Sequence, residues 1–184
     1  MSLIYVFDID NTLYELDDFS YEDLQYSKRL ANNLDAIPAN IPKYILTNAH
    51  SSHADKVLNI LKIKHHFKEI FSRDLMPVMK PHPLCYEYVT QSIMNRENIN
   101  DINDINILFF DDLSDNLEEA HRSSWRTCWI NKYETYNTFV ELENKQSQYI
   151  LNKYDYKFRN INDALEHLQM INSYVCNENN CMLI

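Results

Sequence analysis

The stretch Tyr5-Val6-Phe7-Asp8-Ile9-Asp10-Asn11-Thr12-Leu13-Tyr14 places two acidic residues one position apart, directly after a run of strand-forming apolar residues. We predict a buried β-strand over Leu3 to Ile9, with chemistry at its carboxyl end. Two carboxylates at the edge of a hydrophobic core repel each other and lose hydration. A divalent cation or a catalytic proton exchange is the usual compensation.

The length and composition of the chain predict one globular domain. At 184 residues it can bury one sizeable core, and 45% hydrophobic with 24% charged residues are ordinary globular values. No apolar run approaches the roughly 20 residues that span a bilayer. Because Met1 and Ser2 alone precede the first strand, we expect no signal peptide and a cytoplasmic location.

The charge and the cysteines exclude some classes of partner. A net charge of −10 argues against a general nucleic-acid surface, which needs clustered Lys and Arg. The four cysteines form no Cys-x-x-Cys pair, so we expect free thiols in a reducing compartment and no cysteine zinc site. The terminal Cys181-Met182-Leu183-Ile184 fits a prenylation pattern, but no polybasic stretch supports it, and we favour a chance match and no membrane anchor.

Glycine is absent, while Asn, Ile, Lys and Tyr are abundant, as expected of a coding sequence rich in A and T. Turns that need a positive φ must therefore use Asn or Asp, the next most tolerant residues. We expect several of the asparagines to be turn residues.

Apolar strands alternate with amphipathic helices along the chain. After the first strand, further strands are predicted over Lys43–Leu46, Phe67–Phe71, Ile105–Phe110, Thr127–Ile130 and Tyr156–Phe158. Helices are predicted over Ser20–Leu34, Ser51–Leu61, from Pro83 onward, over Ser114–His121 and over Asn162–Met170. This alternation indicates right-handed crossovers in a three-layer, Rossmann-like α/β fold, a parallel sheet with helices on both faces.

The polar signals all fall at predicted strand ends. Asp8 and Asp10 follow the first strand, Thr47-Asn48 the second and Asp111-Asp112 the fourth, while Lys80 precedes a helix. In a parallel sheet these positions share one rim, where ligands bind. A carboxylate cluster suits Mg²⁺, and with a hydroxyl and an ammonium it suits phosphoryl transfer.

These residues resemble the ordered motifs of the haloacid dehalogenase-like (HAD) hydrolases. The motifs are Asp8-Ile9-Asp10-Asn11-Thr12, Thr47-Asn48, Lys80-Pro81-His82-Pro83 and Asp111-Asp112-Leu113-Ser114-Asp115-Asn116. Each motif alone is weak, but together and in order they are a strong signal.

The resemblance implies a role for each matched residue. Asp8 would be the nucleophile, and Asp10 the general acid and base that also offers its backbone carbonyl to Mg²⁺. Thr47 would bind the phosphoryl group, Lys80 would hold nucleophile and phosphoryl together, and Asp112 would complete the metal site. Supporting roles would fall to the remaining motif residues. Asn48 would bind phosphate, Asp111 would contribute to the metal site directly or through water, and Asn116 would orient these groups. Asp8 would itself be a metal ligand as well as the nucleophile.

A narrower resemblance is to pyrimidine 5′-nucleotidase-like members, carried by Ile45-Leu46-Thr47-Asn48-Ala49, His53-Ala54 and Phe109-Phe110-Asp111-Asp112. Those relatives carry a larger helical cap, whereas this chain offers only a vestigial cap segment over residues 14–42. The single domain would span residues 1–184, with a peripheral insertion at 131–154 and a loose tail at 177–184. A homo-oligomer partner could cover the open site, or the site could admit a bulky substrate.

The other histidine and aromatic residues have less specific interpretations. We assign no catalytic role to the scattered histidines His50, His53, His65, His66 and His82, although His50 and His82 could border the site. The aromatic residues Phe19, Tyr21 and Tyr26 are expected to pack in the core rather than to line a pocket.

Three hypotheses follow for the function. The first is a Mg²⁺-dependent phosphomonoesterase for a small phosphorylated metabolite such as a nucleotide. The second is a capless phosphatase for phosphoproteins or nucleic-acid ends. The third is a binding or regulatory protein that keeps the fold without turnover, and the presence of both Asp8 and Asp10 argues against it.

Overall fold

The structure is a computed structural model that describes residues 1–15, 20–133 and 154–177. Phe19, most of the expected insertion at 131–154 and the tail with Cys181–Ile184 lie outside the described residues. No helix among the described residues is long and apolar enough to cross a membrane.

A six-stranded sheet forms the middle layer, and all its strand pairs are parallel. Its strand order is β3-β2-β1-β4-β5-β6. The strands are β1 Ser2–Phe7, β2 Lys43–Leu46, β3 Ile70–Phe71, β4 Ile105–Asp111, β5 Arg126–Ile130 and β6 Tyr156–Phe158. The parallel α/β fold expected from the sequence is confirmed. From β1 the chain adds strands first on one side (β2, β3) and then on the other (β4, β5, β6), and parallel sheets bind ligands at such a switch point, here between β1 and β4.

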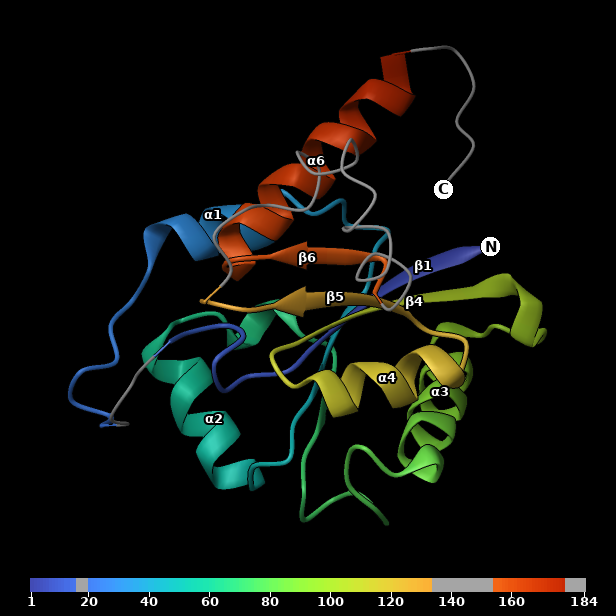
Figure 1. Cartoon of the computed structure of the whole chain (residues 1–184), viewed down its shortest axis with the longest axis horizontal. Coiled ribbons are helices and arrows are strands. Elements are labelled where there is room, and N and C mark those ends of the chain that lie inside the picture. Colours follow the sequence, from blue (N-terminus) through green and yellow to red (C-terminus); the bar gives the residue numbers. More distant parts are fainter. Residues whose placement is uncertain (16–19, 134–153, 178–184) are drawn as a thin grey trace.

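Helices cover both faces of this sheet. They are α1 Lys28–Asp35, α2 Ser51–Ile60, α3 Pro83–Glu97, α4 Ser114–Arg122 and α6 Ile161–Asn177. Apolar residues of α1, α2 and α6 form one core with the sheet, and those of α3 and α4 form another core with it. Figure 1 shows α1 and α6 on one side of β5 and β6, with α3 and α4 on the other side.

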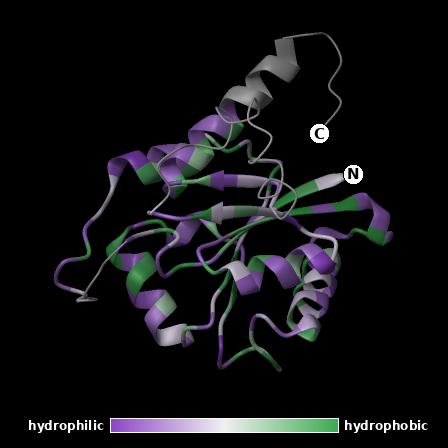
Figure 2. Cartoon of the chain, in the orientation of Figure 1, coloured by the Kyte–Doolittle hydropathy of each residue, from purple (hydrophilic) through white to green (hydrophobic). Residues whose placement is uncertain are grey.

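Hydropathy follows these layers. The residues of β1 from Ile4 to Phe7 are buried, as are those of β4 from Ile107 to Asp111. Figure 2 shows hydrophobic colour along the central strands, whereas the helices mix hydrophilic and hydrophobic residues. Strands that are buried on both faces need such continuous apolar runs.

Some element boundaries differ from the expected ones. The first helix begins at Lys28 rather than near Ser20, because the Ser27 hydroxyl caps it by accepting from the Leu30 backbone N–H at 3.2 Å. Ser20 instead belongs to a turn, in which its hydroxyl accepts from the Glu22 backbone N–H at 3.2 Å. The strand β3 begins at Ile70 rather than at Phe67, after a 3₁₀ helix, η1, at Lys64–His66. The helix α6 is longer than expected.

The aromatic residues before α1 differ from one another. Tyr21 is partly buried and packs against the core that contains α1 and α2, as expected. Tyr26 is 48% exposed, so the expectation that it packs in the core is wrong. Its ring lies 5.7 Å from the Lys62 ammonium at the surface. The late start of α1 explains the difference, because the residues between Ser20 and Ser27 are not helical and do not keep helical spacing.

Positive φ angles occur at non-glycine residues, as the absence of glycine requires. Asn11 has a φ of 57°, and Asn98, which ends α3, has a φ of 55°. Lys62 and Ser124 also adopt positive φ. The expectation that asparagines adopt positive φ is therefore confirmed at Asn11 and Asn98, whereas a lysine and a serine do so at the other two positions.

Candidate active site

The register of the central strands places the expected site residues side by side. Phe7 pairs with Phe110 on one neighbouring strand and with Ile45 on the other. The backbone N–H of Asp8 donates to the Phe110 carbonyl at 2.9 Å, so Asp8 continues the pairing of β1 with β4. Asp8 and Asp111 therefore meet at the carboxyl edge of the sheet.

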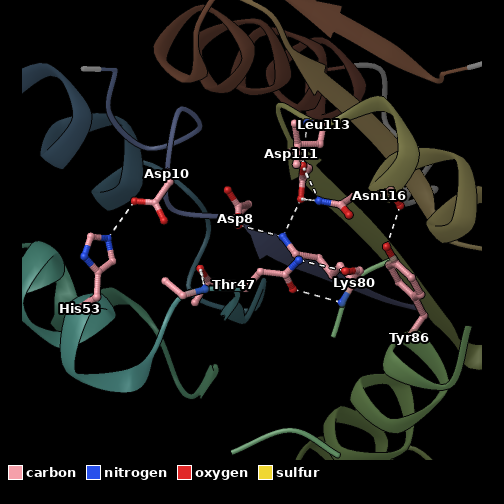
Figure 3. Close-up of polar contacts among 11 residues, drawn as sticks. Asp8, Asp10, Thr47, His53, Lys80, Tyr86, Asp111, Leu113 and Asn116 are labelled. Atoms are coloured by element: carbon pink, nitrogen blue, oxygen red, sulfur yellow. Dashed lines mark hydrogen bonds and ion pairs between the residues drawn. The ribbon is translucent and has the colours of Figure 1, made fainter. Parts of the chain in front are cut away.

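Lys80 lies between these two carboxylates, as Figure 3 shows. Its Nζ donates to Asp8 Oδ1 at 2.8 Å and to Asp111 Oδ2 at 2.6 Å. The side chains of Lys80, Asp8 and Asp111 are only 1%, 9% and 0% exposed. Charge-assisted hydrogen bonds of this kind are strong, and together they fix all three groups.

Burial shapes the acidity of these groups. Burial raises the pKa of Asp8 above its usual range; the ammonium of Lys80 opposes this rise, and the carboxylates of Asp111 and Asp112 add to it. Burial lowers the pKa of Lys80, but the charges of Asp111 and Asp8 outweigh it and raise that pKa overall. Lys80 is therefore a fixed positive charge beside Asp8.

Asp111 accepts hydrogen bonds from several donors. Its Oδ1 accepts from the Leu113 backbone N–H at 2.8 Å, and the Asn116 amide donates to its two oxygens at 3.1 and 3.0 Å. Tyr86 in turn donates to the Asn116 carbonyl at 2.7 Å. A carboxylate offers about four lone-pair positions, and these contacts together with Lys80 occupy them. Asp111 is thus arranged to position Lys80.

Asp112 has a different environment from its neighbour. Burial, followed by the charge of Asp111, raises the pKa of the Asp112 carboxyl to about 6. The Trp129 indole N–H donates to the Asp112 backbone carbonyl at 2.8 Å, which fixes the turn after β4.

A divalent cation fits this carboxylate cluster. Carboxylate oxygens of Asp8, Asp111 and Asp112 lie within 4.8 Å of one another. Lys80 brings one positive charge to three carboxylates, and hard oxygen donors are the ligands that Mg²⁺ prefers. Since Asp111 is already saturated with hydrogen bonds, Asp8 and Asp112 offer the more available oxygens.

The second strand ends in Thr47 and Asn48, which lie beside this cluster. Thr47 is buried, and its hydroxyl accepts from the Ala49 backbone N–H at 3.1 Å. The Asn48 amide donates to the Lys80 carbonyl at 2.9 Å and accepts from the Lys80 backbone N–H at 3.1 Å. The amide of Asn48, expected at the phosphate, is thus engaged in holding the backbone that presents Lys80.

The Asp10 carboxylate points toward α2 rather than into the carboxylate cluster, as Figure 3 shows. Its Oδ1 lies 2.9 Å from His53 Nε2 and also accepts from the Tyr14 hydroxyl. The other ring nitrogen of His53, Nδ1, lies 2.8 Å from the Tyr21 hydroxyl. Sequence reasoning missed His53; the available signal was its place in the first turn of the helix that follows Thr47.

An open cleft of about 550 Å³ borders Asp10. Its lining residues come from the first loop and from the start of α2, and they are Asp10, Asn11, Tyr14, Ala49, His50, Ser52 and His53. His50 therefore borders the site, as the sequence suggested. His82 instead caps α3, where its ring nitrogen accepts from the Leu84 backbone N–H at 3.2 Å.

Comparison with known proteins finds similar structures. No protein-family model and no curated protein sequence matches the chain. Among solved structures, L-2-haloacid dehalogenase from Xanthobacter autotrophicus, with chloropropionic acid covalently bound, matches with a TM-score of 0.57 and 14% identity. The match covers 81% of this chain and 63% of that one.

Two further structures match to a similar degree. A putative HAD-hydrolase, YfnB, from Bacillus subtilis bound to magnesium has a TM-score of 0.58 and 21% identity, with 82% of this chain and 57% of that one covered. A predicted phosphoglycolate phosphatase from Haemophilus somnus has a TM-score of 0.54 and 23% identity, with 78% of this chain and 56% of that one covered.

The chain spans less than two thirds of the length of each of these structures. None of the three is named as a nucleotidase, so the narrower resemblance stays a prediction. All three nevertheless match along most of this chain, with 78% to 82% of it covered. The chain therefore has the fold of the haloacid dehalogenase-like hydrolases.

Proposed function

We propose that the protein is a Mg²⁺-dependent phosphomonoesterase that acts through an aspartyl-phosphate on Asp8. The observation that carries this proposal is the placement of Lys80 Nζ 2.8 Å from Asp8 Oδ1, inside a cluster of three carboxylates. A buried ammonium beside a nucleophilic carboxylate can receive a dianionic phosphoryl group. Asp10, on the cleft side, supplies a second carboxyl for proton transfer.

The first step transfers the phosphoryl group to the protein. An oxygen of Asp8 attacks phosphorus, a new O–P bond forms, and the bond from phosphorus to the ester oxygen breaks. Protonated Asp10 gives its proton to the leaving oxygen, so that an alcohol departs into the cleft. Asp10 is left ionised, with the Tyr14 hydroxyl donating to it and His53 within hydrogen-bond distance.

The second step releases phosphate. The Asp10 carboxylate takes a proton from a water molecule, whose oxygen attacks phosphorus while the bond to Asp8 breaks. Inorganic phosphate leaves, Asp8 returns to its carboxylate form and Asp10 is again protonated. One water is consumed for each ester hydrolysed, and the residues return to their starting state.

Charge on the transferring oxygens needs compensation during both steps. Lys80 supplies a fixed positive charge, and the Thr47 hydroxyl at the end of β2 supplies a donor. Mg²⁺, held by Asp8, Asp112 and the backbone carbonyl of Asp10, would neutralise the negative charge shared by these carboxylates and the phosphoryl oxygens. Asp111 and Asn116 keep Lys80 in place through the hydrogen bonds described above.

The position of Asp10 favours ester hydrolysis over dehalogenation, although a haloacid dehalogenase shares the fold. An alkoxide leaving group must be protonated, whereas a halide leaves as a stable anion without a proton. A carboxyl held at the edge of the cleft by His53 and Tyr14 is suited to the first reaction. The acidic cluster also favours a reaction that uses a cation.

The cleft supports a small substrate. Its volume of about 550 Å³ lies within the range typical of small-molecule sites. We therefore favour a phosphorylated metabolite such as a nucleotide over a phosphoprotein or a nucleic-acid end. Because the segment over residues 14–42 is short, we propose that the outer side of the cleft is covered either by the bound substrate or by a second subunit.

A panel of substrates tests this proposal. Purified protein is incubated with Mg²⁺ and phosphomonoesters, phosphopeptides or 2-haloacids, and phosphate and halide release are measured for wild type and Asp8→Asn. Asp101→Asn, a change at an exposed carboxylate that caps η2 (Ile102–Asp104), is the matched control. We expect Mg²⁺-dependent phosphate release that only Asp8→Asn abolishes. Halide release, or no metal-dependent release from any ester, would overturn the proposal.

A further inference from the structure

A group of metal-ligating side chains lies at the amino end of the sheet, opposite the candidate active site. Asp35 is the last residue of α1 and precedes β2, and His65 and His66 belong to η1, which precedes β3. The strands are parallel, so these segments share the edge opposite the one that carries Asp8. The group therefore belongs to a different part of the molecule from the carboxylate cluster.

The backbone around these residues is ordered by its own hydrogen bonds. The Ala36 N–H donates to the Asn32 carbonyl at 3.0 Å, which closes the last turn of α1. The His66 N–H donates to the Ile63 carbonyl at 3.1 Å. Both segments are thus held in place by backbone contacts before any ligand binds.

The spacing of the side chains is that of ligands around one ion. One ligand atom each from Asp35, His65 and His66 lies within 4.8 Å of the others. His66 Nε2 is 3.8 Å from Asp35 Oδ1. This separation is too long for a hydrogen bond, yet two bonds of about 2.0 to 2.1 Å to a common Zn²⁺ span it. The centres of the two imidazole rings lie 4.1 Å apart.

His66 provides an independent observation that points to a ligand. Its side chain is only 7% exposed, and its Nε2 is buried without a hydrogen-bond partner among the described residues. A buried polar atom without a partner is unfavourable and needs an explanation.

We propose that Asp35, His65 and His66 form a binding site for a transition-metal ion of the Zn²⁺ class. Two imidazoles and one carboxylate are donors that Zn²⁺ accepts, whereas Mg²⁺ prefers a shell of oxygens. His65 also lines an open surface hollow of about 620 Å³, through which water can complete the coordination. Bound there, the ion joins the end of α1 to η1 and so fastens the segment before β2 to the segment before β3.

One neighbouring charge opposes binding. Burial lowers the pKa of Lys43, the first residue of β2, and the nearby carboxylate of Asp35 opposes this fall. Its ammonium therefore competes with the ion for Asp35. Because this competition weakens the contribution of the Asp35 carboxylate, the site favours a dication that binds the two imidazoles strongly over one that relies on the carboxylate alone.

Zn²⁺ titration of the full-length protein tests the proposal. Calorimetry in excess Mg²⁺, which occupies sites that prefer oxygen, compares wild type with Asp35→Asn and His65→Ala. Both of these side chains are exposed, so neither change is expected to disturb the fold. His121→Ala, an exposed histidine in the last turn of α4, is the matched control. We expect one Zn²⁺ bound by wild type and by His121→Ala, and affinity weaker on the order of tenfold or more in the other two variants.

The outcomes separate this site from unspecific binding. If all four proteins bind Zn²⁺ with the same affinity, the ion binds elsewhere and the proposal is wrong. If wild type binds no Zn²⁺ in excess Mg²⁺, the proposal is wrong as well. Neither result depends on phosphatase activity, so the inference stands or fails separately from the proposed function.

Discussion

The two acidic residues of the first loop have opposite surroundings. The Asp8 side chain is 9% exposed and bonded to Lys80 inside the sheet edge, whereas the Asp10 side chain is 42% exposed and faces the cleft. The partner of Asp8 comes from the loop before α3, and those of Asp10 come from α2 and the first loop. One carboxylate is thus fixed by the register of the sheet and the other by side chains packed above it.

This difference suggests separate roles in the proposed function: the buried surroundings of Asp8 for the reaction, and the open surroundings of Asp10 for the choice of substrate. The strand register brings Asp8 and Asp111 together around Lys80, because adjacent parallel strands end at the same edge. The surroundings of Asp10 depend on the residues at the start of α2 and on how the short segment before β2 covers them. In the proposed reaction, the buried side would therefore supply the chemistry, and the open side would decide which ester is hydrolysed.

Removing Lys80 is expected to have the largest effect. Lys80→Met leaves Asp8 and Asp111 buried without their cation, so we expect a loss of about 3 to 5 kcal/mol in the free energy of unfolding. The loss of a fixed positive charge at the phosphoryl group should also lower kcat on the order of 10³-fold. Urea unfolding and phosphate release measure the two effects.

Lys64→Met is the matched control for that change. Lys64 pairs with Asp55 at 2.8 Å, but both side chains are nearly half exposed. Exposed pairs contribute at most about 1 kcal/mol, and we expect no change in kcat. Equal destabilisation by the two lysine variants would show that the buried network does not hold the site together.

The Asp10→Asn variant should separate catalysis from stability. Asp10 is partly exposed, so we expect a change in unfolding free energy within about 1 kcal/mol, while kcat falls on the order of 10²-fold because the leaving oxygen loses its proton donor. An ester with a stable leaving group, such as p-nitrophenol, needs less protonation and should lose less. Equal losses for alkyl and p-nitrophenyl esters would contradict the role of Asp10 as an acid.

Much of this arrangement could be predicted from the sequence, because short stretches of sequence identify the strand ends that carry the site residues. Apolar runs that end in Asp8, Thr47 and Asp111 identify strand ends, and a parallel sheet gathers strand ends at one edge. The family resemblance gave Asp111 and Asp112 different roles, but it did not show that Asp111 is the one that bonds to Lys80, because that contact depends on the register of the strands. Nor could it find His53, whose contact with Asp10 depends on the direction in which α2 leaves the strand.

The His53→Asn variant tests whether His53 positions Asp10. Loss of a hydrogen bond to a charged group costs about 1.5 to 3 kcal/mol in favourable cases, and we expect a fall in kcat on the order of tenfold with KM little changed. His50→Asn is the matched control, because His50 lines the same cleft and is exposed. It should change KM rather than kcat. If His53→Asn changes only KM, then His53 contacts the substrate instead of positioning Asp10.

The smallest expected effect concerns the charge of the carboxylate cluster. The pKa of Asp112 in the folded protein is raised from 3.8 to about 6, so the folded state binds more protons than the unfolded state between these values. The contribution of Asp112 to stability is therefore present below pH of about 4 and is lost as the pH rises through about 6. Without metal, Asp112→Asn should be more stable than wild type at a pH of about 8, by about 1 kcal/mol after allowance for partial exposure, and equal to it near a pH of about 4.

Addition of Mg²⁺ should reverse this order. The ion binds the ionised carboxylates of the folded protein, so it stabilises wild type at a pH of about 8 more than at about 5, where protons compete for the same oxygens. Asp112→Asn lacks one of these ligands and should gain less from the ion. Thermal unfolding of both proteins at each pH, with and without Mg²⁺, measures the difference. A variant that gains as much from Mg²⁺ as wild type would place the ion away from Asp112, and the buried side of the site would then owe its charge balance to Lys80 alone.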